Sequence, residues 1–225
     1  MKIKVGSFAV VLCGSLLLFA AARAQAQVGN RFYFKADIGG NWTQDADLRE
    51  FFGEPLTAGA KVKFDPGLRL GFTTGFRVTE WFSPEVETGI MASEIKSISG
   101  SSSSDAWFYN VPLMFNIRLQ PPHMYTVVPY VGIGTGVSFP SIDVDRISIG
   151  NTSIFDGSDS DAVWAYQAFA GLRFKINENM GISVEYRYFH ADSAQWEADF
   201  ATGSEKFRFG QTETHCVSLA FDFRF

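Results

Sequence analysis

The sequence predicts an all-β fold: an eight-stranded antiparallel up-and-down transmembrane β-barrel with short periplasmic turns and long extracellular loops. Three observations lead to this prediction. Apolar and polar residues alternate with a period of two in eight segments, short and long connections alternate between those segments, and the polar faces combine glycines with charges of both signs. The composition agrees, because a chain with 23 Phe and 21 Gly but a mean hydropathy of +0.02 can average an apolar skin and a polar interior.

The N-terminal segment 1–26 predicts a signal peptide rather than part of the fold. Two lysines precede an apolar stretch over residues 5–22, and Ala24 and Ala26 supply the small residues of a cleavage site. We therefore expect export through the general secretory pathway, cleavage after Ala26, and one outer-membrane β-barrel domain over residues 27–225.

The charge and cysteine content narrow the function classes. Cleavage removes three of the 19 basic residues and none of the 24 acidic ones, so the net charge changes from −5 to −8. An acidic mature chain argues against a nucleic acid partner. The mature chain keeps a single cysteine, Cys216, which cannot form an internal disulfide and is interpreted as a small filler pointing into the barrel.

The first four predicted strands each separate an apolar face from a polar one. They are residues 31–42, 66–78, 84–94 and 107–119. Their apolar faces carry, in order, Phe34 and Ile38, Leu70 and Phe72, Val86 and Ile90, and Leu113 and Phe115. Charged and small residues take the positions between, as at Lys35, Asp37 and Arg69, so each segment fits a strand with two different environments.

The last four predicted strands follow the same rule. They are residues 127–139, 164–176, 182–188 and 217–225. Their apolar faces carry Val131 and Ile133, Ala168 and Leu172, Val184 and Tyr186, and Leu219 and Phe221. Glycines and charges again occupy the other face, as at Gly132, Arg173 and Asp222. Eight strands can close into a barrel that leaves no unpaired edge, which a sheet in lipid requires.

The connections favour a membrane barrel over a soluble sandwich. The short ones are residues 79–83, 120–126 and 177–181, and the long ones are 43–65, 95–106, 140–162 and 191–212. This alternation is typical of barrels with tight periplasmic turns and extended outer loops. Aromatic residues near both ends of the strands predict two interfacial belts, formed by Trp81, Phe82, Phe174 and Phe225 at one end and by Trp42, Trp107, Trp164 and Tyr188 at the other.

The polar faces predict a packed lumen held by ion pairs. Burying an ion is costly unless it is paired, so charges of both signs on these faces should form a network across neighbouring strands. Its main predicted members are Arg77, Glu85, Glu87, Arg118, Arg173, Glu185, Arg187 and Arg224. The pairing depends on strand register, which the alternation pattern leaves open. The network can be a plug that specifies the fold or a gate in a narrow ion path.

Three segments resemble a known family. Residues 109–113 (YNVPL), residues 129–136 (PYVGIGTG) and the ending 221–225 (FDFRF) resemble small Gram-negative outer-membrane barrels of the OmpA/OmpX-like and opacity type, the outer membrane protein β-barrel domain. The resemblance implies outer-membrane lipid and lipopolysaccharide as surroundings. It also implies that an assembly signal at the end of the chain is read by periplasmic chaperones and the barrel assembly machinery, with Phe221, Phe223 and Phe225 as its residues.

The favoured function is a structural or surface-interaction scaffold that is not an enzyme and carries no cofactor. A small-solute or ion pore and a lipid A-modifying enzyme are the alternatives, and a soluble periplasmic β-sandwich is a further one. The enzyme hypothesis rests on His190, Asp192 and Ser193, because a serine nucleophile needs a nearby base and an orienting acid. Eight-stranded outer-membrane enzymes that deacylate lipid A resemble this sequence only in having a His and a nearby Ser late in the barrel. Their spacing is His-x-Ser, whereas here the residue two positions after His190 is Asp192.

The third long connection offers weak candidates for a metal site. Asp156, Asp159 and Asp161 supply hard oxygen ligands suited to calcium or magnesium, although their order does not match an EF-hand. A solvated loop is the alternative interpretation. An extracellular ligand of unknown identity would bind at these outer loops.

Overall fold

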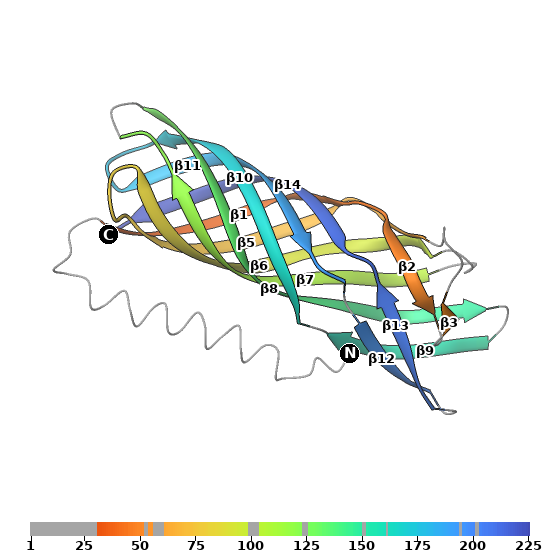
Figure 1. The fold of residues 1–225 in the computed structure, drawn as a ribbon. Coiled ribbons are helices and arrows are strands. Elements are labelled where there is room, and N and C mark those ends of the chain that lie inside the picture. The colour runs from red at the N-terminus through yellow and green to blue at the C-terminus, as the bar shows by residue number, and fades with distance from the viewer. Residues whose placement is uncertain are drawn as a thin grey trace.

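The computed structural model describes residues 31–51, 54–55, 61–98, 104–122, 126–149, 152–160, 162–193, 195–200 and 203–225. Its strands form a 14-stranded sheet, part of which closes into a barrel (Figure 1). Within these ranges there is no helix long and apolar enough to cross a membrane. The predicted signal peptide, residues 1–26, lies outside the described residues.

Eight of the strands form the barrel, each antiparallel to both neighbours, and the β1–β14 pairing closes it. The predicted all-β, eight-stranded antiparallel barrel is therefore confirmed. Around the ring, the strands are β1 (Phe32–Thr43), β5 (Gly67–Phe76), β6 (Phe82–Ile98), β7 (Ser104–Leu119), β8 (Val127–Ile149), β10 (Val163–Lys175), β11 (Met180–Ala191) and β14 (Thr212–Arg224).

The long connections contain strands that the alternation pattern did not predict. They are β2 (Ala46–Phe51), β3 (Glu54–Pro55), β4 (Lys61–Phe64), β9 (Thr152–Ser160), β12 (Gln195–Phe200) and β13 (Gly203–Phe209). β2, β3, β9, β12 and β13 lie beyond the barrel end opposite the C-terminus (Figure 1), and β4 pairs with the end of β6. β8 runs ten residues past its predicted end at Phe139 and pairs with β9, so backbone pairing continues where the side-chain pattern has become polar.

The two faces of the barrel wall have opposite polarity. Large apolar side chains point outward, with Ile133 65% and Leu219 59% exposed, whereas Lys35 and Arg69 point inward and are fully buried. In water an apolar outer face would be costly, but in lipid it is the stable arrangement. The structure thus has the apolar skin and polar interior expected from the alternation.

The predicted aromatic belts lie on this outer face. Trp42, Trp107 and Trp164 are about half exposed at the ends of the strands that lead into the long connections. Trp81 and Phe225 are about half exposed at the short-turn end. Amphipathic rings at both ends of an apolar band are typical of the two boundaries of a bilayer.

Glycines make room in the lumen for large side chains from the neighbouring strand. A Cβ atom at Gly171 would overlap the Tyr130 ring, and one at Gly75 would overlap the Tyr33 ring. The same relation places Gly132 beside Phe169, Gly181 beside Arg173 and Gly71 beside Asp37. Glycine on the polar faces is therefore a packing requirement of a narrow barrel.

Candidate functional site

The middle of the lumen contains a continuous chain of six buried charges. Lys35 Nζ lies 2.7 Å from Glu185 Oε2, and Arg187 Nη2 lies 2.5 Å from Glu185 Oε1. Arg187 Nη1 then reaches Glu87 Oε2 at 2.7 Å. The chain ends through Arg69, whose Nη2 is 2.6 Å from Glu87 Oε1 and whose Nε is 3.0 Å from Asp37 Oδ2. Positive and negative groups alternate along it, three of each, so the chain as a whole is neutral.

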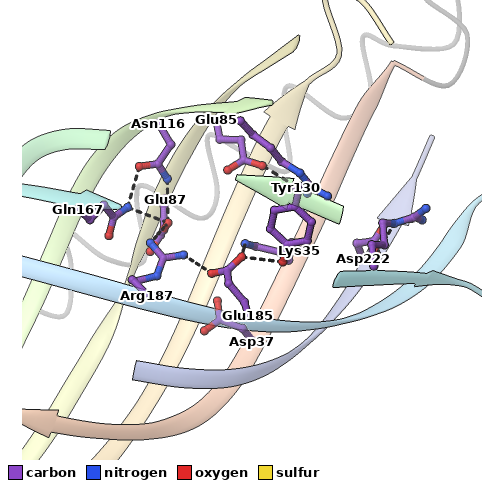
Figure 2. Close-up of polar contacts among 12 residues, drawn as sticks. Lys35, Asp37, Glu85, Glu87, Asn116, Tyr130, Gln167, Glu185, Arg187 and Asp222 are labelled. Atoms are coloured by element: carbon purple, nitrogen blue, oxygen red, sulfur yellow. Dashed lines mark hydrogen bonds and ion pairs between the residues drawn. The ribbon is translucent and has the colours of Figure 1, made fainter. Parts of the chain in front are cut away.

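Glu87 is the centre of this arrangement (Figure 2). Besides the two arginines, Asn116 Nδ2 donates to its Oε2 at 2.8 Å and Gln167 Nε2 donates to the same oxygen at 3.1 Å. Gln167 Nε2 also donates to Asn116 Oδ1 at 2.7 Å. One carboxylate thus binds donors from β5, β7, β10 and β11.

The Glu87–Arg187 pair spans the lumen. Glu87 lies on β6 and Arg187 on β11, and these strands are separated by four steps in either direction around the eight-stranded ring. A 2.7 Å contact between opposite walls leaves no passage between the two side chains. Both residues are buried, at 0% and 1% exposure, so the bond lies out of contact with bulk water.

A second charged cluster lies nearer the short-turn end. Tyr33 Oη donates to Glu85 Oε1 at 2.5 Å, and Arg118 Nη1 lies 3.6 Å from the same oxygen. The Arg118 guanidinium stacks 3.8 Å from the centre of the Tyr130 ring, a distance typical of a cation–π contact. Tyr130 Oη donates to Glu185 Oε2 at 2.8 Å, which connects this cluster to the central chain.

Arg173 and Asp222 form a separate pair on this side of the lumen. Arg173 Nε donates to both carboxylate oxygens, at 2.7 and 2.9 Å, and Arg173 Nη2 lies 2.7 Å from Asp222 Oδ1. The Arg173 side chain is fully buried against the backbone at Gly181. The pair fixes β10 to β14 across the intervening strand β11.

Toward the long-connection end, the lumen becomes apolar. Cys216 points inward, as expected, and its Sγ lies 3.8 Å from Met91 Sδ. Phe64 packs against this buried cluster and contacts the Phe108 ring at 5.3 Å between centres. The buried members are Val62, Met91, Ile95, Ala106, Phe108, Met114, Val163, Ala165, Phe189, Ala191 and Cys216.

The structure brings six of the eight predicted lumen charges into the ion pairs just described: Glu85, Glu87, Arg118, Arg173, Glu185 and Arg187. The other two, Arg77 and Arg224, lie at the short-turn end and are not members of the six-residue chain. The alternation pattern places Lys35, Asp37, Arg69 and Asp222 on polar strand faces, but the predicted main members of the lumen ion-pair network do not include them. Their alternation with outward-facing apolar residues was the signal that could have included them.

His190 has a different environment from that of a catalytic base beside a serine. Its ring stacks on Tyr166, with 4.4 Å between centres, and its Nε2 lies 3.6 Å from Asp192 Oδ1. Its Nδ1 lies 3.9 Å from Glu213 Oε1. The described contacts of His190 are therefore with an aromatic ring and two carboxylates, and Ser193 is not among them.

The predicted metal site lies largely outside the described residues. Asp156 and Asp159 lie in β9 with side chains outside the described part of the chain, and Asp161 is not described. Among the described residues, no group of three or more His, Cys, Asp or Glu could hold a metal ion. In the predicted assembly signal, Phe221 and Phe225 are exposed, and the Phe223 and Phe225 rings meet edge to face at 4.9 Å.

Comparison with known proteins agrees with this architecture. A family model described as outer membrane protein beta-barrel domain matches residues 11–225. A search of curated proteins finds no match.

Solved structures share the fold at low sequence identity. They include the outer membrane protein OprG from Pseudomonas aeruginosa, with a TM-score of 0.60 and 15% identity over 86% of this chain and 96% of that one. Neisserial surface protein A (NspA) gives 0.54 and 14% over 86% and 97%. The outer membrane protease OmpT from Escherichia coli gives 0.50 and 10% over 88% and 98%. At these identities the likeness shows the fold alone.

Proposed function

Because the chain belongs to the outer membrane protein beta-barrel domain family, we propose that it is an anchored surface scaffold with a sealed lumen. In this proposal the barrel resides in the outer membrane and holds strands β2, β3, β4, β9, β12 and β13 outside it. These strands extend the wall beyond the aromatic belt and form the surface available to extracellular molecules. The barrel serves as a support for that surface rather than as a path for solutes.

The ion pair between Glu87 and Arg187 carries the proposal. It joins opposite walls at 2.7 Å, and donors from β5, β7 and β10 surround the same carboxylate. The apolar cluster around Phe108 and Phe189 fills the lumen on the outer side of this layer. Two successive filled layers support a plug over a small-solute or ion pore.

Conductance in planar lipid bilayers tests the proposal. We expect the wild-type protein to give no steady conductance. We expect the variant Glu87→Ser/Arg187→Ser/Phe108→Ala/Phe189→Ala to give measurable channels, because it shortens side chains in both filled layers of the lumen. The matched control is Asp65→Ser/Lys96→Ser, which removes an exposed ion pair of 3.2 Å and also leaves the net charge unchanged. A steady, large conductance of the wild-type protein would overturn the sealed-lumen proposal in favour of a pore.

The same proposal includes no catalytic activity. The neighbours of His190 are Tyr166, Asp192 and Glu213, an arrangement that supports a structural role at the outer rim. Lipid A of unchanged mass after overexpression is the expected result. A shifted lipid A mass that requires His190 would favour the lipid-modifying alternative.

Partners in the membrane and in assembly are part of the proposal as well. Exposed Leu, Ile, Val and Phe side chains on the barrel wall support contact with outer-membrane lipid and lipopolysaccharide. Phe221 in β14 and Phe225 just after its end support recognition by periplasmic chaperones and the barrel assembly machinery, since both rings are exposed.

A further inference from the structure

The outer face of the barrel becomes polar at the long-connection end of four adjacent strands, β10, β11, β14 and β1. In the middle of the wall this face carries exposed aliphatic side chains such as Val184 and Val217. Closer to the long connections, the end that faces outward in such barrels, polar and aromatic side chains follow them. We call this group the rim patch: Gln44, Tyr166, Tyr186, Tyr188, His190, Asp192, Glu213 and His215.

His215 holds one half of the rim patch together. Tyr186 Oη lies 2.7 Å from His215 Nδ1, and Gln44 Nε2 lies 2.9 Å from His215 Nε2, so both ring nitrogens have a partner. The Tyr188 ring lies 5.5 Å from the His215 ring, between centres. These contacts join β11, β14 and the end of β1, and they fix the rings of two tyrosines on the outer face.

Two carboxylates flank His190 in the other half. Asp192 Oδ1 lies 3.6 Å from its Nε2 and Glu213 Oε1 lies 3.9 Å from its Nδ1, and both distances exceed that of a hydrogen bond. His190 Nδ1 is buried and has no hydrogen-bond partner. The Tyr166 ring stacks on His190 at 4.4 Å between centres and is itself 45% exposed. The imidazole therefore leaves the Glu213 carboxylate available beside an accessible ring.

The negative charge of the rim patch faces no lysine or arginine among the described residues. The ion pairs described for Asp192 and Glu213 are with His190 alone, and even a charged imidazole would balance only one of the two carboxylates. Both acids are accessible, with side chains 61% and 31% exposed. The basic residues of these four strands stand at the alternate, lumen-facing positions: Lys35, Arg173, Lys175, Arg187 and Arg224. The patch is thus complementary to a cation.

Exposed aromatic rings beside carboxylates are suited to an organic ammonium group. A cation within about 6 Å of a ring centre is attracted by the negative face of the ring. A carboxylate supplies the counter-charge and accepts an N–H hydrogen bond. The aliphatic side chains next to the patch, Val184 and Val217, lie on the face that meets hydrocarbon and so fit acyl chains. A molecule that matches both surfaces has an ammonium head and apolar chains.

We propose that the rim patch binds the ammonium headgroup of an outer-leaflet lipid. The Glu213 carboxylate and the Tyr166 ring contact the ammonium group, and the acyl chains lie along Val184 and Val217. The inference rests on the outer-membrane location in the proposed function, and it is independent of the sealed lumen because the patch lies on the outside of the wall.

Calorimetric titration of the folded barrel in maltoside detergent with dihexanoylphosphatidylethanolamine tests the proposal. We expect tighter binding of this lipid than of dihexanoylphosphatidylglycerol, which has the same chains but no ammonium group. The variant Tyr166→Leu/Glu213→Gln should lose about tenfold in affinity, since it removes one ring and one charge-assisted hydrogen bond.

The matched control is Tyr109→Leu/Glu94→Gln, which removes the same groups from outward positions of β7 and β6, away from the patch. It should keep the wild-type affinity. Faster gel migration before boiling than after establishes that each variant is folded. No binding of the ethanolamine lipid to the wild-type barrel, equal affinity for the two lipids, or an equal loss in variant and control would overturn the proposal.

Two further measurements identify the occupant and its setting. Phosphoethanolamine without acyl chains should bind more weakly than the lipid, and equal affinity would overturn the assignment to a lipid. Cell fractionation tests the outer-membrane location separately. A protein absent from the outer-membrane fraction would contradict the proposed function, whereas failure of the titration with a protein present there would contradict the lipid site alone.

Discussion

Glu87 is the residue on which the interior depends most. Its carboxylate binds Arg69 and Arg187 and accepts hydrogen bonds from Asn116 and Gln167, and its own exposure is 0%. A carboxylate in such a place is stable only because four donors replace the water it has lost. The same bonds hold two buried arginines, so the loss of Glu87 would leave both without this counter-charge.

We therefore expect Glu87→Ala to destabilise the barrel by about 3–5 kcal/mol, the range for removal of one partner from a buried ion pair. Urea unfolding in lipid vesicles measures it. The control is Glu80→Ala, which removes the same charge from an exposed turn and should change the free energy of unfolding very little. Equal effects of the two substitutions would contradict the central role of Glu87.

Small residues on one barrel strand are matched to large side chains on the next, as β8 and β10 show. Tyr130 on β8 lies over Gly171 on β10, and these two residues face each other in the strand register. The hydroxyl group of Tyr130 then reaches Glu185 at 2.8 Å on the next strand, β11. A small residue on one strand thus positions a long side chain that connects a third strand.

Gly171→Ala should cost about 1–3 kcal/mol, because the new methyl group would lie 2.5 Å from the Tyr130 ring and 2.7 Å from the carbonyl oxygen of Val184. The control is Gly40→Ala on the outer face. There the added Cβ would meet only the side chain of Trp42, at 3.2 Å, which can move aside. The comparison uses chemical denaturation, and a larger loss at Gly40 than at Gly171 would argue against size matching in the lumen.

The molecule as a whole has its charges inside and its apolar residues outside. This arrangement is stable only with hydrocarbon around the barrel wall. The loss in free energy of unfolding caused by a charge on the outer face should therefore depend on how deep in the bilayer the residue lies. Ile133 lies midway along residues 127–139, the part of β8 within the predicted span, and is 65% exposed. Ile176 lies just beyond β10 at the short-turn end and is 56% exposed.

Ile133→Arg should therefore destabilise the barrel in lipid vesicles by about 2–4 kcal/mol, and Ile176→Arg by about 0–1 kcal/mol. The two substitutions are chemically identical and begin from similar exposure, so the difference reports depth alone. Unfolding titrations in vesicles of one lipid composition give both values. Equal changes in the free energy of unfolding at the two positions would contradict the proposed position of the barrel in the membrane.

Most of the barrel wall follows from local patterns. Period-two alternation places Ile133 outside and Arg173 inside without knowledge of any other strand, because neighbouring residues of a strand point to opposite faces. The same pattern identified eight strands and the inward direction of Cys216. The pattern did not predict the strands in the long connections. β9 and the extension of β8 are held together by backbone pairing, and a polar side-chain pattern does not reveal such pairing.

The order of amino acids thus determined the number of barrel strands, their faces and the two ends of the molecule, since each of these depends on residues close together in the chain. Only closure of the barrel decided which charges meet. Glu87 and Arg187 are 100 residues apart and lie on opposite walls, so their contact depends on the register of every strand between them.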